Sequence, residues 1–168
     1  MTAATQSDVK TVQVYRVYIK ATPEAIWEAI TDPDWTDRYG YQGRVELDLR
    51  PGGAFKAGAS ADMKAHGTPD VVIEGEVLEA DPPRKLVQTW HPIWSEEAAA
   101  ERPTRLTYEI EEGGNGVTKL TVIHDVEGAP SVAAQVSGAL EHAGAGGGWA
   151  FVLCDLKSLL ETGSALAG

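Results

Sequence analysis

The four histidines and the single cysteine of this sequence are candidates for acid–base, nucleophilic or metal chemistry. His66, His91, His124 and His142 show no spacing typical of a zinc site, and no HExxH motif, nucleotide-binding loop or nucleophile elbow occurs. Cys154 is the single cysteine, so it has no partner for an internal disulfide, and we expect it to be a small buried residue. The sequence therefore predicts neither a metal ion nor a cofactor.

His124 is the most informative of these residues. Residue alternation places it with Leu120, Val122 and Val126, on the face of a predicted strand that turns toward the interior. A polar group buried there needs a hydrogen-bond partner or loses its charge. Two interpretations stay open: a core histidine satisfied by a neighbour, and a polar anchor in a ligand cavity.

The same alternation adds two further polar residues to the predicted interior. Gln88 shares a face with Trp90 in one predicted strand, and Arg16 shares a face with Val14 and Tyr18 in another. A few polar groups on an apolar interior are typical of a small-molecule pocket, and they are equally typical of an ordinary sheet with a wet edge.

A long helix near the C-terminus must position this interior. Trp149, Val152, Leu153, Leu156 and Leu160 recur at i, i+3, i+4, i+7 and i+11, which places them on one face of a helix. We expect this face to be buried. A glycine at 163 predicts the end of the helix, and the glycines at 144–148 allow a change of direction before it.

The rest of the chain is predicted to form the sheet that this helix covers. The expected elements are a strand at 12–20, a helix at 23–30 that Thr22 and Pro23 start, a second helix no longer than 34–39, strands at 43–50, 54–60, 71–80, 85–91, 104–112 and 117–126, and an Ala-rich helix at 131–142. Residues 62–70 and 93–103 are expected to be loops. Short turns between successive strands favour an antiparallel meander. The predicted fold class is α+β.

Composition limits the location and the partners of the protein. The 168 residues carry a formal net charge of −11 with no segment rich in Lys or Arg, which argues against nucleic acid or an anionic membrane as partner. No apolar run approaches the length of a membrane span, and no secretory signal opens the sequence. We expect a cytoplasmic protein with a disordered tip at 1–10, one domain at 11–163 and a tail at 164–168.

Five local motifs, in this order, resemble homologues of the heat-shock-protein-90 ATPase activator, a branch of the START-like (birch-pollen-allergen-like) superfamily. They are Pro23 to Trp27 with Asp32-Pro33, Arg50 to Phe55, Gly75 to Trp90, Thr104 to Tyr108 with Thr118 to His124, and Gly148-Trp149 with Leu153, Leu156, Leu160 and Glu161. Two segments depart from the family pattern. Residues 36–43 lack an expected Trp-Phe pair, and 143–148 is unusually rich in glycine.

The resemblance implies a helix-grip fold, in which a twisted antiparallel sheet of about seven strands wraps a long C-terminal helix. Both departures lie where the mouth of the family's cavity would be. The predicted function is binding of a small hydrophobic molecule between sheet and helix. The alternatives are a cyclase-like or hydrolase-like enzyme that uses His124 in the same cavity, and a chaperone-associated stress protein. Homodimerisation through a sheet edge also stays open.

The expected ligand-binding residues follow from this arrangement. They are Arg16, Gln88, Trp90, Tyr108, His124, Trp149, Leu153 and Leu156, with Trp35, Tyr39 and Trp94 at the cavity entrance.

Overall fold

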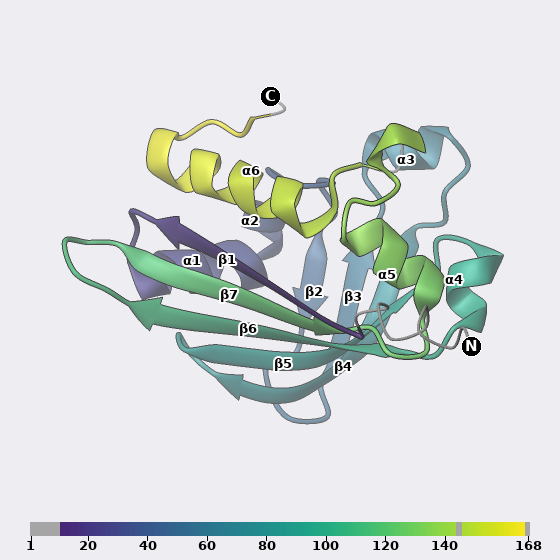
Figure 1. The fold of residues 1–168 in the computed structure, drawn as a ribbon, viewed down its shortest axis with the longest axis horizontal. Coiled ribbons are helices and arrows are strands. Elements are labelled where there is room, and N and C mark those ends of the chain that lie inside the picture. The colour runs from purple at the N-terminus through teal and green to yellow at the C-terminus, as the bar shows by residue number, and fades with distance from the viewer. Residues whose placement is uncertain (1–10, 144–145, 167–168) are drawn as a thin grey trace, which may run out of the picture.

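The computed structural model describes residues 11–143 and 146–166, and the tip predicted at 1–10 lies outside the described residues. Seven strands form one sheet, and the C-terminal helix α6 lies across one face of it (Figure 1). The strands are β1 (Val12–Ile19), β2 (Val45–Leu47), β3 (Ala54–Gly58), β4 (Val71–Asp81), β5 (Lys85–Pro92), β6 (Thr104–Glu112) and β7 (Thr118–Asp125). The helices are α1 (Pro23–Thr31), α2 (Pro33–Thr36), α3 (Ala61–Ala65), α4 (Glu96–Ala100), α5 (Pro130–Val136) and α6 (Gly148–Thr162), with a 3-10 turn η2 (Glu141–Ala143).

The sheet is antiparallel throughout, with the strand order β1-β7-β6-β5-β4-β3-β2. Its first strand pairs along its whole length with its last, from Val12 opposite Asp125 to Ile19 opposite Thr118. Because α1 and α2 carry the chain from β1 to β2, these consecutive strands occupy opposite edges. In Figure 1, β2 and β3 run across the direction of β6 and β7, so the sheet curls around α6. The predicted α+β helix-grip architecture is confirmed.

Capping residues explain where the predicted helices begin and end. The Thr22 hydroxyl accepts a hydrogen bond from Ala25 N at 3.1 Å, and Pro23 occupies the first turn of α1. At the other end of the chain, α6 stops at Gly163, which has a φ of 83°. Glycine is favoured there because a side chain strains a left-handed backbone.

Two short helices lie in segments that were predicted to be loops. Ser60 caps α3 by accepting a hydrogen bond from Met63 N, and Ser95 caps α4 in the same way for Ala98 N, each at 3.2 Å. Each serine precedes a segment compatible with a single helical turn, which is too short for a periodic hydrophobic signal. The Ala-rich helix, predicted to be short and to lie within 131–142, is α5, which ends at Val136.

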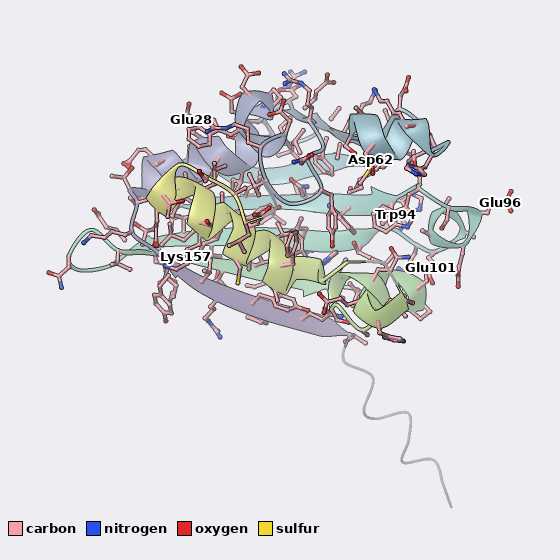
Figure 2. The ribbon with its side chains drawn as sticks, turned by 90° about the horizontal axis from the view of Figure 1, so that it is seen from above. Glu28, Asp62, Trp94, Glu96, Glu101 and Lys157 are labelled. Atoms are coloured by element: carbon pink, nitrogen blue, oxygen red, sulfur yellow. The ribbon has the colours of Figure 1, made fainter. Side chains whose placement is uncertain are left out.

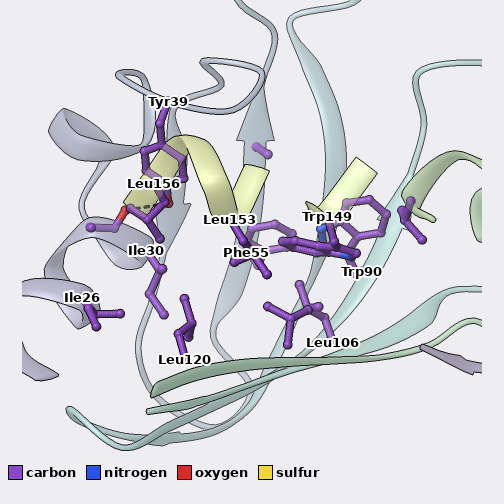
Figure 3. Close-up of a cluster of buried hydrophobic side chains, with 14 of the residues drawn as sticks. Ile26, Ile30, Tyr39, Phe55, Trp90, Leu106, Leu120, Trp149, Leu153 and Leu156 are labelled. Atoms are coloured by element: carbon purple, nitrogen blue, oxygen red, sulfur yellow. Dashed lines mark hydrogen bonds between the residues drawn. The ribbon is translucent and has the colours of Figure 1, made fainter. Parts of the chain in front are cut away.

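The buried face of α6 is shifted slightly from the predicted one. Trp149, Leu153 and Leu156 are buried as expected, whereas Val152 and Leu160 are half-buried and Leu159 is buried. The closed part of the core packs this face against α1 and the strands nearest β1 (Figure 3). Its most deeply buried side chains include Ile19, Ile26, Leu106, Leu120 and Leu156. Each such side chain contributes roughly 1.5–3 kcal/mol before the entropy cost of folding.

Two residues of α6 differ from expectation in their exposure to solvent. Cys154 is exposed, so the prediction of a buried cysteine was wrong. Asp155, predicted on the polar side, is only 1% exposed. Its carboxylate accepts hydrogen bonds from Gly40 N at 2.7 Å and from Leu166 N at 2.6 Å. These two backbone donors compensate the burial of the charge, and they tie the α2–β2 loop and the C-terminal segment to α6.

Candidate functional site

A cavity of about 470 Å³ lies between α6 and the half of the sheet formed by β2 to β5. This volume is within the range of roughly 300–1,000 Å³ that is usual for small-molecule sites. The cavity is lined by Ile30, Thr36, Tyr39, Gly40, Tyr41, Gln42, Gly43, Val45, Leu47, Phe55, Ala57, Gly58, Met63, Thr68, Val72, Ile73, Gln88, Trp90, Trp94, Tyr108, Gln135, Val136, Gly148, Trp149 and Val152. None of these lining residues is Asp, Glu, Lys, Arg or His.

The rim of the cavity is formed where the α2–β2 loop meets the start of α6. Tyr41 and Gln42 are the exposed residues of the lining, and they identify this side as the mouth. The Tyr41 hydroxyl accepts a hydrogen bond from Gly148 N at 3.2 Å, which links the loop to the first residue of α6. Tyr41 and Gly148, one residue from each of the two segments that depart from the family pattern, therefore meet at the mouth.

Six of the eleven predicted site residues line the cavity. Gln88 and Trp90 extend from β5, Tyr108 extends from β6, and Trp149 extends from the first turn of α6. Trp94 lies between α3 and α4 in the view of Figure 2. Tyr39 was expected at the entrance but is only 9% exposed, and its hydroxyl donates a hydrogen bond to Ala29 O at 2.9 Å (Figure 3).

Arg16 does not line the cavity. It is exposed on the outer face of β1 with Val14 and Tyr18, and the residues of β1 that turn inward are those next to it, including Val17 and Ile19. The sequence offered apolar residues on both faces of this strand, so alternation alone did not determine which face is buried.

Leu153, Leu156 and Trp35 are also not part of the cavity wall. The two leucines pack in the closed half of the core, and Val152, one residue before Leu153, lines the cavity instead. Trp35 packs against the core from α2, with the Arg38 guanidinium 4.5 Å from its ring centroid. The i+3 spacing from Trp149 to Val152 is the sequence signal that could have identified this wall residue.

His124 is fully buried and lies behind the cavity wall rather than in it. Its Nδ1 accepts a hydrogen bond from Trp149 Nε1 at 3.0 Å, and its Nε2 lies 2.8 Å from Thr104 Oγ1. The Thr104 hydroxyl donates its proton to Trp90 O at 2.6 Å. It must therefore accept from His124, which assigns the Nε2–H tautomer.

This network holds His124 in its neutral form. Burial lowers the pKa of His124 to about 4, against a weaker opposing effect of Asp125. A proton on Nδ1 would face the indole N–H of Trp149, so the ring cannot be protonated without loss of that bond. With both nitrogens occupied, His124 fixes the orientation of Trp149 at the cavity wall. The geometry supports the interpretation of a core histidine over that of a cavity anchor or catalytic base.

An aromatic cluster forms the wall next to this histidine. The ring of Trp90 lies 5.9 Å from that of Trp94, edge to face, and 6.4 Å from that of Trp149. Tyr108 meets Trp149 edge to face at 6.1 Å. Burial raises the pKa of Tyr108, so its phenol is neutral at physiological pH. Figure 3 shows Trp90 and Trp149 side by side beneath α6.

Two buried polar atoms of the wall lack hydrogen-bond partners in the described part of the chain. They are Gln88 Oε1 and Trp94 Nε1, an acceptor and a donor. Within residues 11–143 and 146–166 there is no group of three or more His, Cys, Asp or Glu side chains able to hold a metal ion. The same residues include no helix with the length and apolarity needed to cross a bilayer.

Several solved structures are similar to this one. CalU16 from Micromonospora echinospora is 20% identical, with 93% of this chain and 78% of that chain covered and a TM-score of 0.62. DynU16, a protein of the dynemicin biosynthetic locus, is 22% identical, with coverage of 94% and 49% and a TM-score of 0.66. The Aha1 dimer from Colwellia psychrerythraea is 18% identical, with coverage of 92% and 98% and a TM-score of 0.61. At these identities the likeness shows the fold alone.

Sequence comparison identifies the family. A search of curated protein sequences finds no match to the chain. The family model described as "Activator of Hsp90 ATPase homolog 1-like protein" matches residues 20–161, from the end of β1 to the last turn of α6. Because this match spans most of the sequence and the structure has the START-like fold, the chain belongs to the family of Activator of Hsp90 ATPase homolog 1-like proteins.

Proposed function

We propose that this protein binds a small hydrophobic molecule in the cavity between α6 and β2 to β5. The observation that carries the proposal is the cavity itself, which is mostly apolar and opens at Tyr41 and Gln42. Its lining includes seven aromatic residues: Tyr39, Tyr41, Phe55, Trp90, Trp94, Tyr108 and Trp149. A wall packed only for stability would close this space, because protein interiors normally leave few voids larger than a water molecule.

Burial of a ligand in this space supplies the driving force for binding. Apolar surface removed from water contributes roughly 25 cal/mol per Å². The fold already holds the wall in place, since His124 orients Trp149 and Asp155 fixes the loop at Gly40. A wall positioned in advance loses little conformational freedom when a ligand binds.

A cavity-filling substitution tests the proposal. Ala57 of β3 is buried and lines the cavity, whereas Ala54 of the same strand is exposed. We expect Ala57→Phe to reduce the affinity for the neutral dye N-phenyl-1-naphthylamine at least tenfold, because the added ring occupies the cavity. Ala54→Phe adds the same ring outside and should leave the affinity unchanged. Dye fluorescence titrations measure both.

Native mass spectrometry of the gently purified protein provides an independent readout. A discrete extra mass that is lost on denaturation is expected for the wild type and for Ala54→Phe, and it should be absent in Ala57→Phe. The proposal is wrong if the wild type carries no such mass and binds the dye no better than the folded Ala57→Phe variant does.

A second candidate function is stimulation of an Hsp90-type chaperone ATPase. It is favoured by the family description and by the likeness to a Plasmodium falciparum protein described as an HSP90 activator. The measurement is the ATPase rate of the chaperone with and without this protein. An unchanged rate at saturating concentration would eliminate this candidate. The enzymatic alternative has no such support, because His124 lies outside the cavity wall.

Homodimerisation through a sheet edge stays a proposal. Val12, Val14 and Tyr18 of β1 are 44%, 45% and 58% exposed, which places an apolar strip on an edge strand of the sheet. The Aha1 protein from Colwellia psychrerythraea is described as a dimer, which favours homodimerisation.

A further inference from the structure

The cavity wall restricts the charge of a ligand. Within the described residues, no Asp, Glu, Lys, Arg or His lines the cavity. The nearest buried carboxylate on α6, that of Asp155, is absent from the lining and is occupied by two backbone N–H groups. A carboxylate or ammonium group brought into this space would lose its hydration without gaining a counter-charge. The wall is suited to an uncharged molecule.

The wall also contains polar groups that the protein itself does not satisfy. Gln88 is only 2% exposed, and its Oε1 has no partner within the described residues. Trp94 is half-buried, and its buried Nε1 also has no partner there. Buried polar groups are nearly always hydrogen-bonded in native proteins, and an unpartnered one destabilises the fold. Rotation of the Gln88 amide allows it to present either its oxygen or its nitrogen.

These two side chains lie on the same part of the wall. Gln88 precedes Trp90 by two residues in β5, so both extend from the same face of the strand, and the ring of Trp90 contacts that of Trp94. The surrounding rings of Tyr108 and Trp149 make this the most aromatic part of the cavity.

We propose that Gln88 and Trp94 determine ligand specificity, and that the ligand is a neutral, largely apolar molecule with a hydrogen-bond acceptor for Trp94 Nε1 and a donor or acceptor for the Gln88 amide. A hydroxyl group on an aromatic or alicyclic ring supplies both functions. This inference rests on the proposed ligand-binding function and adds the polarity and charge of the ligand to it.

Three probes of similar shape separate these properties. They are 2-naphthol, which is neutral and forms hydrogen bonds, 2-methylnaphthalene, which forms none, and 2-naphthoate, which is an anion at neutral pH. Isothermal titration calorimetry with the full chain should show 2-naphthol binding about tenfold more tightly than 2-methylnaphthalene, the expected gain from satisfying a buried polar group. The anion should bind at least tenfold more weakly than 2-naphthol.

Two variants identify the residues responsible. Gln88→Leu and Trp94→Phe each remove one unpartnered polar atom and leave an apolar side chain of comparable or smaller size. Each should reduce the preference for 2-naphthol over 2-methylnaphthalene to less than about threefold, with the affinity for 2-methylnaphthalene retained. Gln88→Leu should also raise the thermal midpoint of the ligand-free protein, which confirms that the variant folds.

The outcomes distinguish this inference from the proposed function. Equal binding of 2-naphthol and 2-methylnaphthalene by the wild type would overturn the inference and leave the proposed function intact. Tightest binding of 2-naphthoate would overturn the assignment of a neutral ligand. A preference for 2-naphthol that survives in both variants would overturn the role of Gln88 and Trp94. Failure of all three probes to bind would contradict the proposed function itself.

Discussion

Acidification from about pH 7 to about pH 4.5 is expected to lower the free energy of unfolding by about 2–3 kcal/mol through the titration of His124 alone. The folded state holds the pKa of this residue at about 4, whereas the ordinary value is 6.5. Between these two values the unfolded chain binds a proton that the folded protein does not bind. The stability is therefore fully present above pH 6.5 and is lost as the pH falls toward 4.

The physical cause is the position of His124 beneath Trp149. The imidazolium form would be desolvated, and it would replace the acceptor at Nδ1 by a donor that faces the indole N–H of Trp149. The Thr104 hydroxyl does not compensate for this loss, because its proton is already donated to Trp90 O. Both effects oppose protonation of the folded state.

Other acidic titrations act mainly below this range. Burial opposes the ionisation of Glu101, but hydrogen bonds from Ser131 and Val132 outweigh it and lower the pKa of its carboxyl. A hydrogen bond from Lys157 lowers the pKa of Glu161. A carboxyl with a depressed pKa contributes stability above its ordinary value, here 4.5, and loses it below that value. The change in the free energy of unfolding between pH 4.5 and 6.5 therefore depends chiefly on histidine.

The matched control is His124→Gln, which retains a polar side chain and does not titrate. Urea unfolding at several pH values between 7 and 4.5 measures both proteins. The variant should be less stable at pH 7 and should show little further loss on acidification. Subtracting the free energy of unfolding of the variant from that of the wild type also removes the effect of the overall negative charge. The repulsion among the acidic side chains decreases at lower pH in both proteins. Parallel pH profiles would show that His124 is not the titrating group.

The elements of this fold were largely predictable because their signals are local. The helix face that begins at Trp149, the stop at Gly163 and the alternation of Leu120, Val122 and His124 each depend on a few adjacent residues, and the structure contains all three. The one-turn helices α3 and α4 were missed because a serine cap is their main signal.

The site was less predictable, because it depends on which half of the interior is hollow. His124 and Gln88 were both assigned correctly to inward faces, but only Gln88 lines the cavity. The difference arises from packing between distant segments, since Trp149 of α6 covers His124 of β7. The burial of Asp155 has the same origin, because its partners Gly40 and Leu166 are remote in sequence or lie beyond the helix end.

Replacement of Gly148 by alanine is expected to destabilise the protein by about 3–4 kcal/mol, which corresponds to a fall of roughly 10 °C in Tm. Gly148 has a φ of 67°, and a Cβ there would lie 2.3 Å from Val136 O and 2.6 Å from Gly138 N. These are backbone atoms of α5 and the turn after it, so no side-chain rotation can relieve the contact. Thermal unfolding by circular dichroism measures the effect.

Gly163→Ala is the matched control at the opposite end of the same helix. Gly163 also has a positive φ, of 83°, but nothing lies within 4 Å of the position of its Cβ. Its replacement should cost only about 1 kcal/mol, the strain of a left-handed backbone, or roughly 2–4 °C in Tm. Equal losses in the two variants would show that the α5–α6 junction yields and that close packing at Gly148 is not what the glycine provides.

Replacement of Gly148 should also change the shape of the cavity, because this residue connects the start of α6 to the mouth. Its N–H donates to the Tyr41 hydroxyl, and Gly148, Tyr41 and Trp149 all line the cavity. An alanine that pushes α6 away from α5 would displace the rim and the aromatic wall together. We therefore expect Gly148→Ala to weaken binding of N-phenyl-1-naphthylamine at temperatures where the variant is still folded, whereas Gly163→Ala should bind the dye as the wild type does. The glycine before α6 then serves to bring three segments close enough to enclose the cavity.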